Sequence, residues 1–133
     1  MIITEIKQLQ LMCEEVKTIK EGEEIGAQLL KELTESDNGI GLAANQIGIN
    51  KRVCVINVKE PIVLINPRIV EQSEEQFMFA EGCLSFPFLF LSINRPKWCS
   101  VRYTDQHGKE IEETLHGMSA RIFQHENEHM NGY

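Results

Sequence analysis

The sequence lacks any apolar run long enough to span a bilayer, and its first residues lack the charged-then-apolar order of a secretory signal. Basic residues are in the minority, since 13 Lys and Arg face 20 Asp and Glu and give a net charge of −7. No basic run is present either, so a surface for nucleic acid, phosphate groups or lipid is not expected. These absences predict a cytoplasmic protein that binds neither nucleic acid nor a membrane directly.

The cysteines have no C-x-x-C spacing. The four are Cys13, Cys54, Cys83 and Cys99. In a cytoplasmic chain we expect them to be thiols rather than a disulfide framework. No repeat or low-complexity tract divides the 133 residues, of which 42% are hydrophobic. Length and composition therefore predict a single domain, residues 1–133, built on one core.

Hydrophobic periodicity predicts both helices and strands along the chain. The helices are expected over residues 6–19, 22–34 and 118–131. Alternating or β-branched segments between the last two helices predict strands over residues 52–58, 62–65, 67–70, 97–105 and 109–115. Asn66-Pro67 is expected to end one of these strands, which would leave residues 67–70 as a short edge strand. The predicted class is α+β, with antiparallel strands packed around the C-terminal helix.

The last predicted helix contains a His-Glu-x-x-His pattern. His125 and His129 are four residues apart, so on a helix they lie one above the other. Two imidazoles in this position can hold one metal ion. Glu126 lies beside them, where its carboxylate can accept a proton from an attacking water.

A helical wheel at about 100° per residue tests this interpretation. Met118, Ile122, His125 and His129 fall on one stripe, and Glu126 lies next to it in the arc expected to be buried. A buried carboxylate is costly unless it is paired or close to a cation. The position of Glu126 therefore favours a metal site over two core histidines at a chance spacing. The opposite, polar side of the wheel carries Arg121, Gln124, Asn127, Glu128 and Asn131.

Residues 39–48 are rich in glycine and alanine, although their composition is not that of a linker. Small residues allow a ligand or another backbone to approach closely. A phosphate loop is excluded, because G-x-G-x-x-G is absent and no Lys-Ser or Lys-Thr follows. Taken alone, the segment leaves a ligand-binding Gln46 and a turn with a solvated Gln46 equally open. The apolar residues 86–91 fit either the core or the wall of an apolar site, and we favour the core.

Three segments resemble, in sequence and in order, those of the peptide deformylase family. They are residues 39–46 (Gly-Ile-Gly-Leu-Ala-Ala-Asn-Gln), residues 81–85 (Glu-Gly-Cys-Leu-Ser) and residues 124–129 (Gln-His-Glu-Asn-Glu-His). The order of elements is similar over roughly residues 22–132. Because the sequence stops at Tyr133, shortly after His129, the resemblance implies a compact form without a C-terminal extension.

The resemblance also implies a role for individual residues. Cys83 becomes the third metal ligand beside His125 and His129, which leaves the fourth position of a tetrahedral site open to water. The implied metal is Fe2+, with Ni2+ or Zn2+ as substitutes. Glu126 is the implied general base and acid. The implied oxyanion donors are the Gln46 amide and the Leu84 backbone N–H, and the implied substrate-binding residues are Gly39, Ile40, Gly41, Phe79, Glu81, Met118 and Ile122.

The implied reaction is the co-translational removal of the formyl group from the N-formylmethionine that starts new polypeptides. We expect a monomer that acts on N-formylmethionyl peptides near the ribosome exit. Two alternatives are a His-Glu-x-x-His metallopeptidase, which usually takes a third ligand after the helix, and a deacylase for another N-acyl peptide. A non-catalytic metal domain would need a fourth protein ligand, and none is evident.

Two positions depart from the family pattern. The family often has Asp where Glu128 stands, and Glu128 lies outside the buried arc, so we expect it to form an ion pair with Arg95. Residues 88–90 read Phe-Leu-Phe where bacterial members commonly have an arginine, so one contact to the peptide is not expected here.

Overall fold

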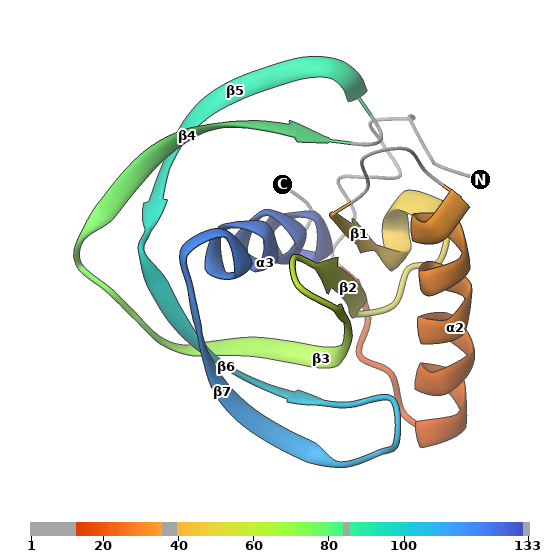
Figure 1. Ribbon diagram of the computed structural model, residues 1–133. Helices are drawn as coiled ribbons and strands as arrows, with labels where there is room; N and C mark the ends of the chain where they lie inside the picture. Colours follow the sequence, from red (N-terminus) through yellow and green to blue (C-terminus); the bar gives the residue numbers. More distant parts are fainter. Residues whose placement is uncertain (1–12, 36–39, 84–85, 132–133) are drawn as a thin grey trace.

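The computed structural model describes residues 13–35, 40–83 and 86–131, with the backbone alone for 77–83 and 86–94 (Figure 1). The chain order is α2 (Ile19–Glu35), β1 (Gly41–Ala43), the 3₁₀ helix η1 (Ala44–Ile47), β2 (Val53–Asn57), β3 (Pro61–Gln72), β4 (Gln76–Cys83), β5 (Phe86–Pro96), β6 (Trp98–Thr104), β7 (Glu110–His116) and α3 (Gly117–Met130). Among the described residues, no helix is long and apolar enough to cross a membrane.

The strands form a sheet of order β1-β2-β3-β6-β7 and a separate ribbon, β4–β5, and every pairing is antiparallel. Helix α3 packs against β1 and β2 of the sheet and against β5 of the ribbon, and Figure 1 shows the ribbon arching over this helix. Helix α2 also contacts β2 and β3. The predicted α+β class, with antiparallel strands around the C-terminal helix, is confirmed.

The sheet separates two apolar clusters, because successive strand residues point to opposite faces. In β2, Cys54 and Ile56 pack in the cluster that includes Phe123 of α3, whereas Val53 and Val55 pack in the cluster that includes Leu29 of α2. The first four residues of β2, all of them apolar, are therefore buried on alternating faces of the sheet. This arrangement leaves α3 covered by the sheet on one side and by the ribbon on another.

The helix predicted over residues 6–19 is wrong for residues 13–18, which are not helical, and residues 6–12 lie outside the described part. The Cys13 N–H donates to the Met130 carbonyl at 2.8 Å, and Glu14 forms a β-bridge with Lys51. Cys13 and Val16 are three residues apart, as on one helix face, but they pack in the two different clusters. Apolar spacing alone could not reveal that the segment crosses from one cluster to the other.

Strand β3 runs through the Asn66-Pro67 pair that was expected to end it. Asn66 has a φ of 51°, and the register with β6 shifts between Ile65 and Arg68, as in a β-bulge. Asn tolerates positive φ better than most residues. Its side chain also accepts from the Val16 N–H at 2.7 Å and donates to the Val16 carbonyl at 2.8 Å. The pair therefore kinks the strand instead of ending it. Residues 67–70 are not a separate strand as predicted, because they continue β3, where Arg68 and Ile69 pair with β6.

The predicted polar side of the C-terminal helix is partly wrong. Arg121 and Gln124 were placed on the solvated side, yet they are only 1% and 6% exposed. Gln124 donates through its Nε2 to the Pro96 carbonyl at 3.1 Å, at the end of β5. The ribbon therefore covers a face of α3 that the helical wheel assigned to solvent.

Candidate metal centre

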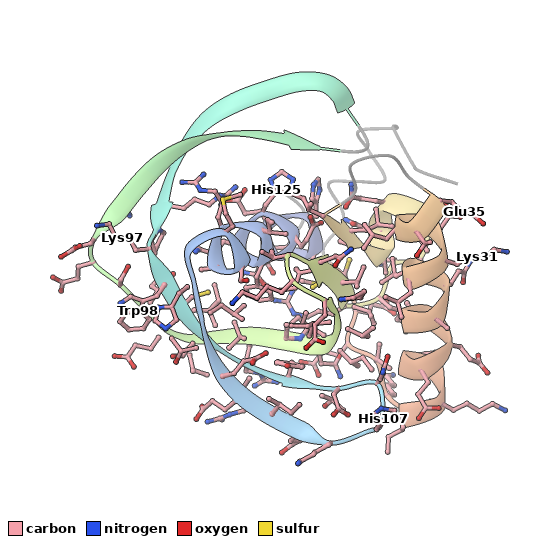
Figure 2. The ribbon with its side chains drawn as sticks, viewed as in Figure 1. Lys31, Glu35, Lys97, Trp98, His107 and His125 are labelled. Carbon is pink, nitrogen blue, oxygen red and sulfur yellow. The ribbon has the colours of Figure 1, made fainter. Side chains whose placement is uncertain are left out.

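Helix α3 brings the two histidines into contact through their outer ring nitrogens. His125 Nε2 and His129 Nε2 are 3.2 Å apart, and the rings meet edge to face with centroids 4.9 Å apart. Figure 2 shows His125 on the side of α3 that faces the β4–β5 ribbon. Two nitrogens that bind one tetrahedral ion at about 2.0–2.1 Å lie about 3.3–3.4 Å apart. The pair therefore fits two ligands of one metal ion with almost no movement.

The third predicted ligand, Cys83, has a side chain outside the described set. Its backbone is the last residue of β4 and pairs with Phe86, at a register shift that follows Gly82. Among the side chains that the structure describes, no group of three His, Cys, Asp or Glu residues gathers as a metal site. The fit to a metal consequently rests on the two histidines.

The other three cysteines are buried free thiols. Burial raises the pKa of Cys13 and of Cys99 to about 11. Burial also raises the pKa of Cys54 well above its usual range, and the nearby Glu126 carboxylate adds to this effect. None of these three cysteines lies in a group of three possible metal ligands among the described residues.

Glu126 is buried beside the histidines and against β1. Its side chain is only 4% exposed. A Cβ atom on Gly41 would lie 2.7 Å from Glu126 Oε2 and 2.7 Å from Ile122 Cγ2. Glycine at position 41 therefore provides the space that the carboxylate occupies. The small residues of this segment predicted close approach by a ligand or another backbone, whereas at Gly41 the approaching groups are the side chains of Glu126 and Ile122.

Gln46 is held in place by its own turn. It lies in η1, is 1% exposed, and accepts from the Ala43 N–H through its Oε1 at 3.0 Å. The alternative of a solvated Gln46 is therefore wrong. Because the Oε1 faces Ala43, the NH₂ group points away from that bond. The preceding residue, Asn45, donates from its Nδ2 to the His129 carbonyl at 2.7 Å, so η1 is tied directly to the histidine helix.

The remaining predicted residues are only partly brought together. Ile122 is buried and Met118 packs against the same cluster, as the stripe on the wheel predicted. Ile40, next to Gly41, is 48% exposed. Gly39 and Leu84 lie outside the described residues, as do the side chains of Phe79 and Glu81, so their predicted roles stay predictions.

The ion pair expected for Glu128 is confirmed. Arg95 Nη1 lies 2.6 Å from Glu128 Oε1, and Nη2 lies 3.2 Å from Oε2. This two-pronged contact joins the end of β5 to the turn of α3 that carries His129. Arg95 is only 4% exposed, whereas the Glu128 side chain is about half exposed.

We expect Glu128→Gln to destabilise the metal-loaded protein by about 1–2 kcal/mol, because a buried cation loses its charged acceptor while half-exposure of the partner weakens the effect. Urea unfolding of the purified variant would measure the loss of stability, and metal analysis would measure its metal content. Glu112→Gln, which breaks an exposed pair with Arg102, is the matched control and should change stability by less than about 0.5 kcal/mol. Unchanged stability and metal content for Glu128→Gln would contradict the expectation.

Two residues that hold the site were not singled out from the sequence. Asn45 was noted only as a polar neighbour of Gln46. Arg52 was included only as the first residue of a predicted apolar strand. The one available signal was a charged residue at the start of a strand whose next four residues are apolar. The contact partners of Arg52 on α3 are more than 70 residues away, beyond the reach of any local pattern.

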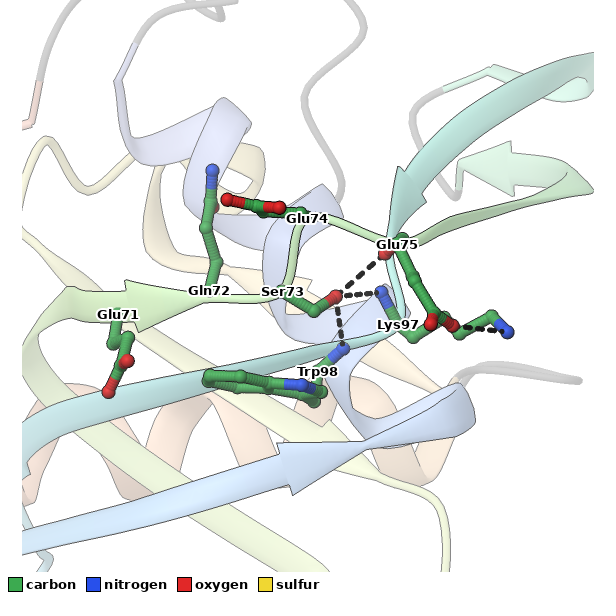
Figure 3. Close-up of a pocket in the computed structure, with 7 residues that line it drawn as sticks. All are labelled: Glu71, Gln72, Ser73, Glu74, Glu75, Lys97 and Trp98. Carbon is green, nitrogen blue, oxygen red and sulfur yellow. Dashed lines mark hydrogen bonds and ion pairs between the residues drawn. The ribbon is translucent and has the colours of Figure 1, made fainter.

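A separate hollow of about 500 Å³ lies away from the predicted site residues, where the β3–β4 turn meets the start of β6 (Figure 3). Ser73 Oγ accepts from the Lys97 N–H at 2.8 Å and from the Trp98 N–H at 3.3 Å, and donates to the Glu75 carbonyl at 2.7 Å. Lys97 also pairs with Glu75 at 3.0 Å. These bonds fasten the base of the ribbon to the sheet.

A sheet and a ribbon around a helix that presents paired imidazoles and a buried carboxylate define a metal-dependent hydrolase of the His-Glu-x-x-His class. The family model described as polypeptide deformylase matches residues 2–133. The chain belongs to the peptide deformylase family, whose members require a divalent metal ion.

Individual relatives agree with this assignment. The peptide deformylase of Pseudothermotoga lettingae is 40% identical over 135 residues, which cover 96% of this chain and 79% of the relative. A probable peptide deformylase from Synechococcus phage S-SSM7 has a TM-score of 0.89 at 38% identity, over 96% of this chain and 90% of that one. The Synechococcus elongatus enzyme, solved in complex with actinonin, also has a TM-score of 0.89 at 38% identity, over 95% and 70%. Other relatives align over only 58–61% of their own length.

Proposed function

We propose that this chain removes the formyl group from the N-terminal formylmethionine of nascent polypeptides. The observation that supports it most directly is the pair of imidazoles 3.2 Å apart, with the buried Glu126 carboxylate beside them. Membership of the peptide deformylase family supports the same reaction. We also propose that the protein acts as a monomer near the ribosome exit.

In this proposal His125, His129 and Cys83 hold one divalent ion, with Fe2+ as the native metal and Ni2+ or Zn2+ as substitutes. Two imidazoles and a thiolate make a mixed nitrogen and sulfur site that leaves one position for the substrate or water. When bound, the ion polarises the formyl carbonyl and makes its water more acidic.

The proton transfers are assigned to Glu126. Its carboxylate takes a proton from the attacking water and then delivers it to the amine that leaves. Gly41 allows the carboxylate to lie against β1, so the base is already in place before the substrate binds.

Charge that develops on the formyl oxygen is stabilised by two donors, the Gln46 side-chain amide and the Leu84 backbone N–H. The Ala43 N–H holds the Gln46 oxygen at 3.0 Å, which fixes the orientation of the amide. The donor therefore needs little reorganisation when charge develops, which is the condition under which such donors are most effective.

The peptide is proposed to bind along β1. β1 lies at one end of the described strand order and pairs with β2 through one of its edges. A peptide could extend the sheet there through the backbone of residues 39–41. Its methionine side chain would enter a pocket formed by Phe79, Glu81, Met118 and Ile122.

The test uses protein prepared without oxygen and loaded with Fe2+. Formate release from formyl-Met-Ala-Ser is the expected result, and actinonin should inhibit it. Acetyl-Met-Ala-Ser tests the deacylase alternative, and a longer peptide with internal peptide bonds tests the metallopeptidase alternative. Neither peptide should be cleaved. Absence of formate release by metal-loaded protein would overturn the proposal.

A further inference from the structure

His129 lies in the final turn of α3, because the helix ends at Met130. The last carbonyl groups of a helix have no partner within the helix, and helix ends fray unless outside groups hold them. His125 lies one turn further inside. The position of the His129 ring therefore depends more strongly on contacts made from outside the helix.

Arg52 makes two such bonds to the end of α3, and a third hydrogen bond to β3, from one guanidinium group. Its Nη1 donates to Asn131 Oδ1 at 2.8 Å, and its Nη2 donates to Asn127 Oδ1 at 2.7 Å. Its Nε donates to the Pro67 carbonyl at 2.9 Å. The two amides are four residues apart on α3, and they flank His129 by two residues on each side. A planar fork with fixed donor directions suits two such acceptors, whereas a lysine ammonium could not satisfy all three.

The bulge in β3 completes this arrangement. Asn66, at positive φ, donates its N–H to the Arg52 carbonyl at 2.7 Å, and Pro67 then supplies the carbonyl that accepts from Arg52 Nε. Arg52 is consequently fixed by β3 at its backbone and its side chain before it reaches α3. Burial lowers the pKa of Arg52, and the guanidinium stays charged near the C-terminal end of the helix, where a cation is favourable.

We propose that Arg52 is a positioning residue for the metal centre: through Asn127 and Asn131 it fixes the last turn of α3, so that His129 stays in place to hold the ion. Its effect on turnover rests on the proposed function, whereas its effect on metal retention does not. Asn45 and the Cys13 N–H also hold this turn, through the carbonyls of His129 and Met130, but they do not fix the side of the helix that carries the two amides.

The test compares Arg52→Lys and the double variant Asn127→Ala/Asn131→Ala with the parent protein. Each is loaded with Co2+ and mixed with a chelator, and the rate of metal loss is followed by absorbance. We expect both to lose metal about tenfold faster, as when support around metal ligands is removed. Arg68→Lys is the matched control, because Arg68 pairs with Glu15 at 3.6 Å on an exposed surface, and its rate should be unchanged.

Two further measurements separate positioning from general stability. The rise in melting temperature on adding metal should be smaller in both variants than in the parent, and kcat should fall about tenfold with KM within about twofold. Metal loss within twofold of the parent in both variants, or an equal fall in melting temperature with and without metal, would overturn the inference. If Arg52→Lys does not fold, the double variant decides by the same measures. If no protein releases formate while metal retention changes as expected, the proposed function fails and the positioning role stands.

Discussion

Glu126→Gln is expected to lower kcat for formate release about a thousandfold or more, while the metal stays bound. The amide has nearly the same shape as the carboxylate but cannot accept the proton from water, and positioned acid–base groups typically contribute 10²- to 10⁴-fold. The measurement is single-substrate kinetics of formate release at equal metal content, with metal analysis of each preparation. A variant that keeps more than a tenth of the parent rate would show that another group moves the proton.

A second variant tests the position of this carboxylate rather than its chemistry. Gly41→Ala adds a methyl carbon that would lie only 2.7 Å from Glu126 Oε2 and 2.7 Å from Ile122 Cγ2. The carboxylate must shift, and we expect kcat to fall about ten- to a hundredfold, since small misplacements of reacting groups cost this much. Metal content should be retained, because the atoms nearest the added methyl group belong to Glu126 and Ile122 rather than to a histidine. An unchanged kcat would mean that the site tolerates movement of Glu126.

The helix features that the sequence predicted correctly depend on local spacing. The i, i+4 spacing of His125 and His129 determines that their rings meet on a helix, and the wheel correctly placed Glu126 in the buried arc. The ion pair of Glu128 with Arg95 was also predicted, from the position of Glu128 outside that arc, and it is present. The first two predictions needed only the spacing of residues on one helix, and the third needed only a pair of opposite charges.

The features that the sequence did not predict depend on contacts between distant segments. Gln124 is buried where it bonds to the end of β5, and no periodicity within α3 records the presence of the β4–β5 ribbon. Asn45 and His129 are 84 residues apart in the chain, and the contacts of Arg52 with α3 span 75 and 79 residues. Such side-chain contacts between distant segments become visible only when the strands are placed in register around the helix.

Removing the metal is expected to lower the melting temperature by about 10–20 °C. An ion that binds only the folded chain stabilises it by about 4 kcal/mol at a thousandfold excess over its Kd, and a domain of this size gains about 3–4 °C per kcal/mol. An ion held by the two imidazoles would join the last turns of α3, and that helix lies between the sheet and the ribbon, so we expect its loss to destabilise the whole fold.

Thermal unfolding by circular dichroism, with and without a chelator and at fixed protein concentration, measures this difference. His125→Ala removes one ligand, so its melting temperature should hardly respond to the metal and serves as the control. Equal melting temperatures of the metal-loaded and metal-free parent would contradict binding at the histidine pair. A full metal response in His125→Ala would place the stabilising ion elsewhere, because a site built on the two facing nitrogens cannot lose one of them and keep its affinity.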